Sequence, residues 1–371
     1  MKKAVSIFLV LAMAVGCFAG CGSKEAKKDA DKFYIGGIGP TTGGAAVVDE
    51  INEAGGINGK KIEFNFQDDQ SDAEKSVNAY NTLKDWGMQV LMGTVTTTPC
   101  VAVADKTAQD NMFEVTPSAS STDVIAGDNV FQVCFTDPNQ GTKSAQYIGE
   151  NKLAKKVAVI YNSSDVYSSG IEAKFIEEAK NQGLEVVAEE AFTADSKTDF
   201  STQLKKAQDG GAELVFLPIY YTEASIILTQ ADQMGYQPKF FGCDGLDGLL
   251  AVKNFDTKLA EGVMLLTPFA ADATDDLTKK FVKEYKDKYD EVPNQFAADA
   301  YDAIYAIKAA MEEAKVTPDM SVTDMGDALK SAMTKVTIDG LTGDKMSWSD
   351  SGEVNKDPKA VVIENGEYVG M

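Results

Sequence analysis

Two short runs of the chain are almost wholly apolar: KVAVIY at residues 156–161 and ELVFLPI at residues 213–219. Continuous apolar runs of this length are typical of parallel strands that helices cover on both faces. Between the two runs, Ser169 and Glu172 have the spacing of a capping box, and apolar residues follow them at helical intervals. This succession of strand, helix and strand predicts an α/β unit.

The same alternation continues on both sides of these runs. Further strands are predicted at residues 33–38, 61–67, 89–92, 112–116, 130–135, 184–192, 239–242 and 262–267. A second capping box, formed by Ser71 and Glu74, predicts a helix over residues 72–86. Because the stretches 33–135 and 156–267 have similar size and rhythm, the sequence predicts two α/β lobes with a cleft between them.

The segment after residue 267 has a different pattern. Three helices with little strand between them are predicted at residues 277–289, 295–314 and 322–333. Residues 348–352 have the composition of a hairpin turn, and they precede two short strand candidates at 360–363 and 368–369.

The composition excludes several classes of function. The chain has 371 residues, 44% of them hydrophobic, and a formal charge of −22, which fits about two globular domains. It contains no histidine and no arginine, so a Ser-His-Asp triad and imidazole metal ligands are excluded. The negative charge opposes nucleic-acid binding. With no nucleophile–base pair or cofactor motif either, we expect no enzyme activity, no cofactor, no metal and no nucleic-acid partner.

The N-terminus has the pattern of a bacterial lipoprotein signal. Two lysines precede an apolar run that ends in FAGCGS, in which the cysteine is Cys21. Small residues before a cysteine resemble the lipobox, where the cysteine receives lipid and becomes the first residue of the mature protein. We therefore predict a signal peptide over residues 1–20, a lipidated Cys21 and a flexible tether over 21–32, with Cys17 as a second candidate. This predicts an extracytoplasmic protein that is lipid-anchored to the cell membrane.

Three local patterns have both a functional and a structural interpretation. Residues 37–39 (GIG) follow a strand, but the dinucleotide fingerprint needs a third glycine where Thr42 stands. The three aspartates within residues 68–72 would either hold a cation or favour the N-terminus of the following helix. A disulfide or buried free thiols are the alternatives for the three remaining cysteines, Cys100, Cys134 and Cys243.

Two hydroxyl-rich loops follow neighbouring strand candidates. Residues 94–98 come after the strand at 89–92, and residues 118–122 come after the strand at 112–116. Open α/β sheets bind ligands at the carboxyl ends of parallel strands, where hydroxyl and helix N-terminal N–H groups can meet an anion. Serine and threonine also cap helices, so one loop alone carries little weight. Two such loops in neighbouring units favour a ligand site.

Seven short motifs are spread between Phe33 and the end of the chain. They are Gly39-Pro40-Thr41-Thr42-Gly43, DEINEAGGINGK at residues 49–60, Gln67-Asp68-Asp69, Thr116-Pro117-Ser118-Ala119, Asp199-Phe200-Ser201, Phe241-Gly242-Cys243-Asp244-Gly245 and Gly340-Leu341-Thr342-Gly343. Each motif is weak by itself. Together they resemble the leucine/isoleucine/valine-binding family of bacterial ABC-transporter receptors.

The resemblance implies a fold of two doubly wound parallel-sheet lobes joined by three hinge crossovers, the periplasmic binding protein type I fold. Lobe 1 is then expected at residues 33–136 and 268–358, and lobe 2 at residues 137–267 and 359–371. The late helices return to lobe 1 in this arrangement, which explains why they leave the strand–helix rhythm. The family binds its ligand between the lobes, which close by hinge motion.

The resemblance also implies a set of ligand-binding residues. Thr97 falls where the family holds the ligand α-carboxylate, and Ser118 and Ser120 fall where a carbonyl and a hydroxyl meet the head group. Asp244, with Gly245 beside it, matches the acidic residue that pairs with the ligand ammonium. Since the chain has no arginine, hydroxyl and N–H groups must hold the carboxylate. The rest of the pocket is expected from Val95, Tyr167 and Tyr220.

The resulting prediction is a monomeric substrate-binding lipoprotein that delivers a small amino acid, branched-chain or otherwise apolar, to an ABC permease and its ATPase. The alternative is a receptor of the same fold for another small polar ligand, such as an amide, urea or an aromatic acid. The side-chain end of the pocket, rather than the head-group residues, would distinguish the two.

The first helix departs from the family pattern. The segment around Val47 and Val48 is shorter than in the family, and a tyrosine that flanks the ligand there has no counterpart. We predict a short helix over residues 45–54, with the glycine pairs at 43–44 and 55–56 as loop.

Overall fold

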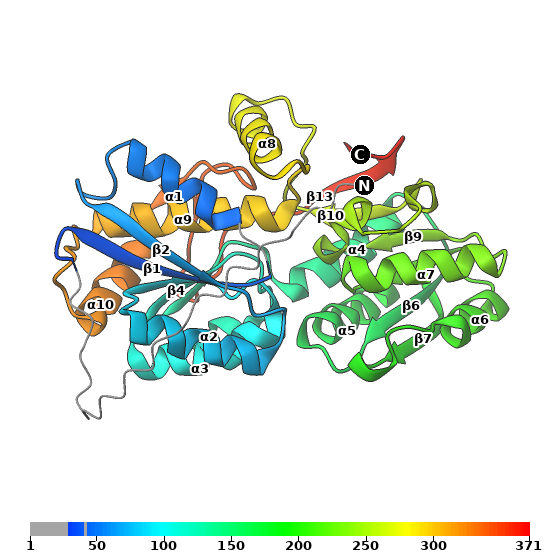
Figure 1. The fold of residues 1–371 in the computed structure, drawn as a ribbon. Helices are drawn as coiled ribbons and strands as arrows, with labels where there is room; N and C mark the ends of the chain where they lie inside the picture. The colour runs from blue at the N-terminus through cyan, green and yellow to red at the C-terminus, as the bar shows by residue number, and fades with distance from the viewer. Residues whose placement is uncertain (1–28, 41–42) are drawn as a thin grey trace, which may run out of the picture.

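The structure, a computed structural model, describes residues 29–40 and 43–371 and contains two large β-sheets flanked by helices (Figure 1). The first sheet is wholly parallel and consists, in spatial order, of β2 (Lys61–Gln67), β1 (Lys32–Ile38), β3 (Val90–Met92), β4 (Phe113–Thr116) and β5 (Val130–Gln132). The second sheet consists of β14 (Glu367–Gly370), β13 (Lys359–Glu364), β10 (Met264–Thr267), β9 (Lys239–Gly242), β8 (Leu214–Leu217), β6 (Lys156–Asn162) and β7 (Glu185–Phe192). Its two C-terminal strands, β13 and β14, pair antiparallel.

The helices fall into the same two groups as the sheets. Those beside the first sheet are α1 (Gly43–Glu53), α2 (Ala73–Trp86), α3 (Thr97–Asp110), α9 (Gln295–Glu313) and α10 (Val322–Met333). Those beside the second sheet are α4 (Asp137–Glu150), α5 (Val166–Asn181), α6 (Ser201–Gly210) and α7 (Tyr221–Gln233). The remaining elements are α8 (Asp276–Tyr289), the short strands β11 (Thr337–Ile338) and β12 (Met346–Ser347), and the 3₁₀ turns η1 (Thr122–Ile125), η2 (Ala194–Ser196), η3 (Asp244–Leu246), η4 (Leu249–Ala251) and η5 (Thr257–Ala260).

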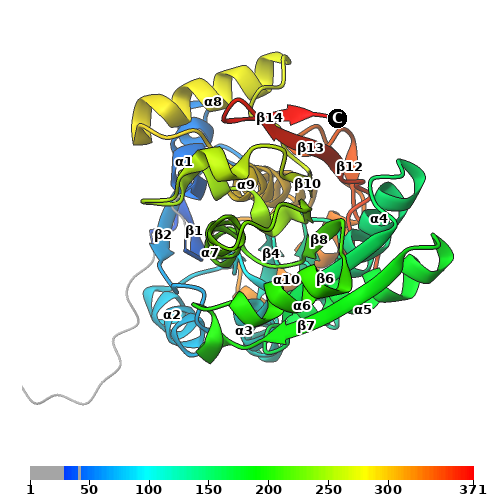
Figure 2. The same cartoon turned by 90° about the vertical axis from the view of Figure 1, so that its right-hand side faces the viewer.

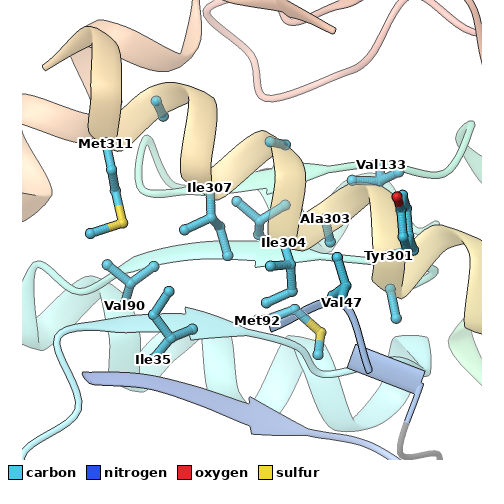
Figure 3. Close-up of a cluster of buried hydrophobic side chains, with 14 of the residues drawn as sticks. Ile35, Val47, Val90, Met92, Val133, Tyr301, Ala303, Ile304, Ile307 and Met311 are labelled. Atoms are coloured by element: carbon cyan, nitrogen blue, oxygen red, sulfur yellow. The ribbon is translucent and has the colours of Figure 1, made fainter. Parts of the chain in front are cut away.

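Apolar helix faces cover both sides of the first sheet. Figure 3 shows Ile304, Ile307 and Met311 of α9 against Ile35 of β1 and Val90 of β3, and all five side chains are fully buried. Helices α2 and α3 cover the opposite face through a second apolar cluster. Because both faces are covered, a central strand such as β3 (Val90–Met92) carries buried apolar residues at successive positions.

The second sheet is covered in the same way. Helices α6 and α7 pack on one face and α4 and α5 on the other (Figure 2). From its β7 edge, the order β7-β6-β8-β9-β10 repeats the order β2-β1-β3-β4-β5 of the first sheet. In each sheet the order in which successive strands are added therefore reverses next to the first strand: between β1 and β3 in the first sheet, and between β6 and β8 in the second. Such switch points in doubly wound sheets are where ligands bind.

The chain passes between the two sheets three times: after β5, after β10 and before β13. This is the predicted two-lobed architecture with three crossovers. Among the described residues, no helix combines the length and the apolar composition that crossing a bilayer requires.

Two helices begin at other residues than predicted. Asp72, rather than Ser71, caps α2, because its carboxylate accepts the N–H of Lys75 at 2.9 Å. Helix α5 begins one turn early, with Asp165 as its N-cap. Ser169 then lies inside the helix, where its N–H and its hydroxyl both donate to the Asp165 carbonyl. In both places an aspartate occupies the capping position that the sequence analysis gave to a serine.

The N-terminal unit also differs in detail. The glycine pair at 43–44 was predicted as loop but belongs to α1, whereas the pair at 55–56 forms the turn after it with positive φ angles. Lys32 was predicted to end the tether but begins β1, because it pairs in register with Lys61 of β2. The shorter segment still forms a helix and a parallel crossover.

Candidate ligand-binding site

Loops that follow strands of the first sheet contact loops that follow strands of the second. The Thr98 hydroxyl, after β3, donates to the Asp165 carboxylate, after β6, at 2.8 Å. These loops lie at the two switch points, so the sheets bring their ligand-binding ends together. We call residues 94–98 and 118–122 the hydroxyl wall, and Tyr167, Tyr220 and residues 244–247 the acidic wall.

The hydroxyl wall presents the start of α3. The helix begins at Thr97, and its N-cap Thr96 makes no side-chain capping bond. The Thr97 hydroxyl accepts the N–H of Ser120 at 3.1 Å, which joins the two hydroxyl-rich loops. Thr97 and Ser120 are fully buried. A helix N-terminus with nearby hydroxyls is an arrangement that binds anions such as carboxylates.

The other predicted residues of this wall point in different directions. The Ser118 hydroxyl donates to the Asp299 carboxylate of α9 at 3.1 Å, so it turns into the first lobe. The Ser120 hydroxyl is buried and has no hydrogen-bond partner at ordinary distance among the described residues, but it lies near enough to the Asp137 carboxyl to oppose the rise in the pKa of that carboxyl. Val95 packs on Gly39, where an added Cβ would lie 2.3 Å from Val95 Cγ2. Of these three side chains, Ser120 is therefore the one with a free polar atom at the wall.

The acidic wall is a bonded unit. The Tyr167 hydroxyl donates to Asp244 Oδ1 at 2.8 Å and accepts the N–H of Gly245 at 3.0 Å. The Tyr220 ring stacks on the Tyr167 ring, with centroids 4.8 Å apart. Position 245 requires glycine, because a Cβ there would lie 2.6 Å from the Tyr167 hydroxyl oxygen. All four predicted residues of the second lobe thus lie together.

Asp244 is buried, with 2% of the residue exposed. Burial raises its pKa to about 7, and the hydrogen bond from the Tyr167 hydroxyl offsets part of that rise. Burial also raises the pKa of Tyr220 well above its ordinary value, while the nearby backbone of Thr97 acts in the opposite direction. A cation placed beside Asp244 would restore its charge.

Helix α4 joins the two walls through residues that the sequence analysis missed. The N–H of Asp137 donates to the Ser120 carbonyl at 2.9 Å, and Gln140 Oε1 accepts the N–H of Asp244 at 3.3 Å. Asp137 is itself buried, and burial raises the pKa of its carboxyl well above the usual range. Their position in the sequence could have indicated them, because both residues come within five residues of the end of the last strand predicted in the first α/β stretch.

Buried side-chain atoms without hydrogen-bond partners in the described part of the chain gather where the two walls meet. Among the described residues, they belong to Thr96, Ser120, Gln132, Asp137, Asn139, Gln140 and Gln295. These residues lie on the hydroxyl wall, at the end of β5, in the first turn of α4 and at the start of α9. Since buried polar groups are normally hydrogen-bonded, this concentration favours a site that a polar ligand completes.

A buried ion pair supports the hydroxyl wall from behind. Lys356 Nζ lies 3.1 Å from Asp299 Oδ1, and their side chains are 2% and 0% exposed. The same ammonium donates to the Val133 carbonyl at 2.9 Å and to the Thr342 hydroxyl. Because Asp299 also accepts from Ser118, the crossover that carries Lys356 is tied to the wall. Burial raises the pKa of Asp299 to about 6, against the opposing effect of Lys356.

The remaining sequence patterns have structural roles. Asp69 accepts the N–H of Ser71 and the hydroxyl of Ser76, and Asp72 caps α2. In the part of the chain that the structure describes, no group of three metal-ligating side chains occurs. Burial raises the pKa of the three described thiols, which are free and buried: Cys100, Cys134 and Cys243.

Comparisons with known proteins agree with this architecture. The family model described as periplasmic binding protein matches residues 35–367. A Leu/Ile/Val-binding protein homolog of Brucella melitensis is 31% identical over 91% of this chain and 93% of its own length. An isoleucine complex of a branched-chain amino acid binding protein from Streptococcus pneumoniae has a TM-score of 0.80 at 26% identity, over 91% of this chain and 97% of that one. A leucine-binding protein of Thermotoga maritima has a TM-score of 0.80 at 25% identity, with the same two coverages. The chain therefore belongs to the periplasmic binding protein family, among relatives of the leucine/isoleucine/valine-binding type.

Proposed function

We propose that this protein is the extracytoplasmic receptor of an ABC importer and that it binds a small α-amino acid between its two lobes. One observation carries the proposal. A buried carboxyl, Asp244, stands on one wall of the cleft, and a helix N-terminus with buried hydroxyls stands on the other. This is the complement of a zwitterion, because an ammonium needs an anion and a carboxylate needs donors.

Each predicted residue has a distinct task in this proposal. Asp244 pairs with the ligand ammonium, and Thr97 with the start of α3 holds the α-carboxylate. Ser120 contributes its unpartnered hydroxyl, and Ser118 contributes its backbone carbonyl. The others shape the pocket: Tyr167 and Tyr220 cover the head group, Gly245 makes room for Tyr167, and Val95 lies toward the side-chain end.

The contact between Thr98 and Asp165 supports binding by lobe closure. It joins α3 of the first lobe to α5 of the second at 2.8 Å. Closing the lobes removes water from the cleft, which strengthens the pairing of the ligand charges with Asp244 and with the start of α3. The two-lobed family closes by hinge motion at such crossovers.

Attachment to the membrane is a separate part of the proposal. Cys21 and Cys17 lie outside the described residues, so the lipoprotein assignment rests on the sequence alone. We expect Cys21→Ala to move the protein from the membrane fraction to the soluble fraction, because a two-chain lipid is enough for stable anchoring. If the variant stays with the membrane and Cys17→Ala releases it instead, the anchor is Cys17.

The decisive experiment is mass spectrometry of ligand released from protein that was purified without denaturation, followed by calorimetry. The panel contains α-amino acids, a simple amide, urea and benzoate. We expect an α-amino acid to be released unchanged in mass and to rebind. Binding of benzoate, urea or the amide without any α-amino acid would replace the proposal with the alternative ligand class. A released compound that the protein converts would indicate an enzyme.

A further inference from the structure

Gln295 is a fully buried glutamine whose side chain lacks partners. It is 0% exposed, and neither Nε2 nor Oε1 has a hydrogen-bond partner among the described residues. An unpaired buried amide is costly to folding, so its retention calls for a partner that binds there.

The backbone of Gln295 is bonded to the acidic wall. Its backbone N–H donates to Asp247 Oδ2 of the acidic wall at 2.9 Å. The N–H of Asp247 donates in turn to the carbonyl of Asp244 at 2.9 Å. One turn further along α9, on the same helix face, Asp299 accepts the Ser118 hydroxyl. The start of α9 therefore lies between the two walls, at the junction of the lobes (Figure 1).

The Gln295 side chain does not belong to the outer surface. A groove of about 520 Å³ runs along the outside of this junction, and Asp247, Pro293 and Asn294 help to line it. Its lining does not include Gln295. The zero exposure of Gln295 and its absence from this lining place its amide inside the junction rather than on the groove surface.

We infer that Gln295 hydrogen-bonds the side chain of the ligand, and that the ligand is an α-amino acid with a neutral hydroxyl or carboxamide side chain. The inference rests on the proposed function. Asp244 and the start of α3 account for the two charges of the head group. An amide donates as well as accepts, so Gln295 needs an acceptor that a ligand ammonium does not provide.

Two other ligand classes fit this environment less well. A wholly apolar side chain would leave both atoms of the Gln295 amide unpaired. A charged side chain would bury a further charge beside a neutral amide, which costs more than burying a dipole. The inferred ligand class, amino acids with a neutral polar side chain, therefore differs from the apolar amino acids that the family resemblance predicted.

Pairs of amino acids with the same shape test this preference. Asparagine and leucine form one pair, and threonine and valine form the other. Calorimetry on the full-length wild-type protein should show the polar member of at least one pair binding about 10- to 100-fold more tightly. Leucine and valine binding as tightly as asparagine and threonine would overturn the inference and leave the proposed function standing. Absence of binding by every α-amino acid would overturn the proposed function itself.

A substitution then tests whether Gln295 is the residue responsible. Gln295→Met keeps the length of the side chain and removes its polar atoms, so the preference within each pair should fall to about onefold or reverse. Gln230→Met is the matched control, since its amide bonds Phe200 and Thr198 beside α7 rather than the cleft. This control should keep the wild-type ratio. The ratio is measured within one variant and is independent of folding yield; an unchanged ratio in Gln295→Met would overturn the assignment.

Discussion

The two walls of the cleft are built in opposite ways. On the acidic wall, the polar groups already bond to one another, because the Tyr167 hydroxyl joins the Asp244 carboxylate to the N–H of Gly245. On the hydroxyl wall, the side-chain oxygens of Thr96 and Ser120 are buried and find no hydrogen-bond partner within the described part of the chain. The protein therefore fixes the carboxylate of the acidic wall, while two hydroxyls of the opposite wall, those of Thr96 and Ser120, are available to a ligand. Substitutions on the two walls should consequently divide differently between stability and affinity.

The largest effect should come from Asp244→Ala. It removes the anion that faces the ligand ammonium and should cost about 2–5 kcal/mol of binding free energy, or about 30- to 5,000-fold in Kd, measured by calorimetry. Asp256→Ala is the control, because Asp256 is an exposed cap of η5 in the same lobe. Unchanged affinity in a folded Asp244→Ala protein would show that Asp244 only shapes the turn, and that the acidic wall does not bind the ligand ammonium.

The pH dependence of binding should be nearly as large. Burial raises the pKa of Asp244 to about 7, whereas the ammonium binds the ionised form. Below pH 7 a ligand must displace a proton, so affinity should fall as the pH is lowered, by up to about tenfold per unit, and level off above pH 7. Calorimetry from pH 5 to 8 measures this slope, to which Asp299 and Asp137 also contribute by charge coupling. Asp244→Asn should flatten the profile, and a slope that persists in Asp244→Asn would assign the titration to those neighbours.

Much of the fold was predictable because its strands are buried on both faces. The predicted bounds of β9 are those observed, and three of its four residues are buried. The bounds of β2 were also predicted, although β2 is an edge strand whose residues are mostly half-buried. The prediction for β5 was too long, because the chain leaves the sheet after Gln132 while residues 133–135 stay buried. An apolar run thus indicates that the segment is buried. It indicates a strand only where a neighbouring strand can also form backbone hydrogen bonds with it.

The candidate site was predictable only where its residues sit in short motifs. Asp244 lies in one of the seven motifs, and Thr97 and Ser120 lie in the two hydroxyl-rich loops; all three follow strands. Gln140 and Gln295 lie in helices, where the dominant pattern is the helical repeat of apolar residues. The position of Gln295 depends on contact with Asp247, which is 48 residues away in the chain. No local pattern records such a contact.

Tyr167→Phe should sharpen the contrast between the walls. It removes the donor to Asp244 and the acceptor for the Gly245 N–H, so it should lower the free energy of unfolding by about 1–3 kcal/mol and also weaken binding at pH 7. Thermal or denaturant unfolding and calorimetry measure the two effects. Tyr236→Phe is the control, since it removes a hydroxyl bonded to the Ala212 carbonyl elsewhere in the lobe. Tyr236→Phe should lose stability and keep the wild-type affinity. If Tyr167→Phe also keeps the wild-type affinity, Tyr167 is not part of the ligand site.

The smallest effect should come from Ser120→Ala, on the opposite wall. Its hydroxyl has no partner to lose among the described residues, so the free energy of unfolding should stay the same or rise slightly. Affinity should nevertheless fall by about 0.5–1.5 kcal/mol, or about 2- to 13-fold, because one hydrogen bond to the ligand is lost. Ser321→Ala provides the control outside the walls: the Ser321 hydroxyl accepts the N–H of Asp324 at the start of α10, so this change should cost stability and leave affinity unchanged. If Ser120→Ala instead lowers stability and leaves affinity unchanged, the Ser120 hydroxyl stabilises the fold rather than binding ligand, and the proposed difference between the two walls is wrong.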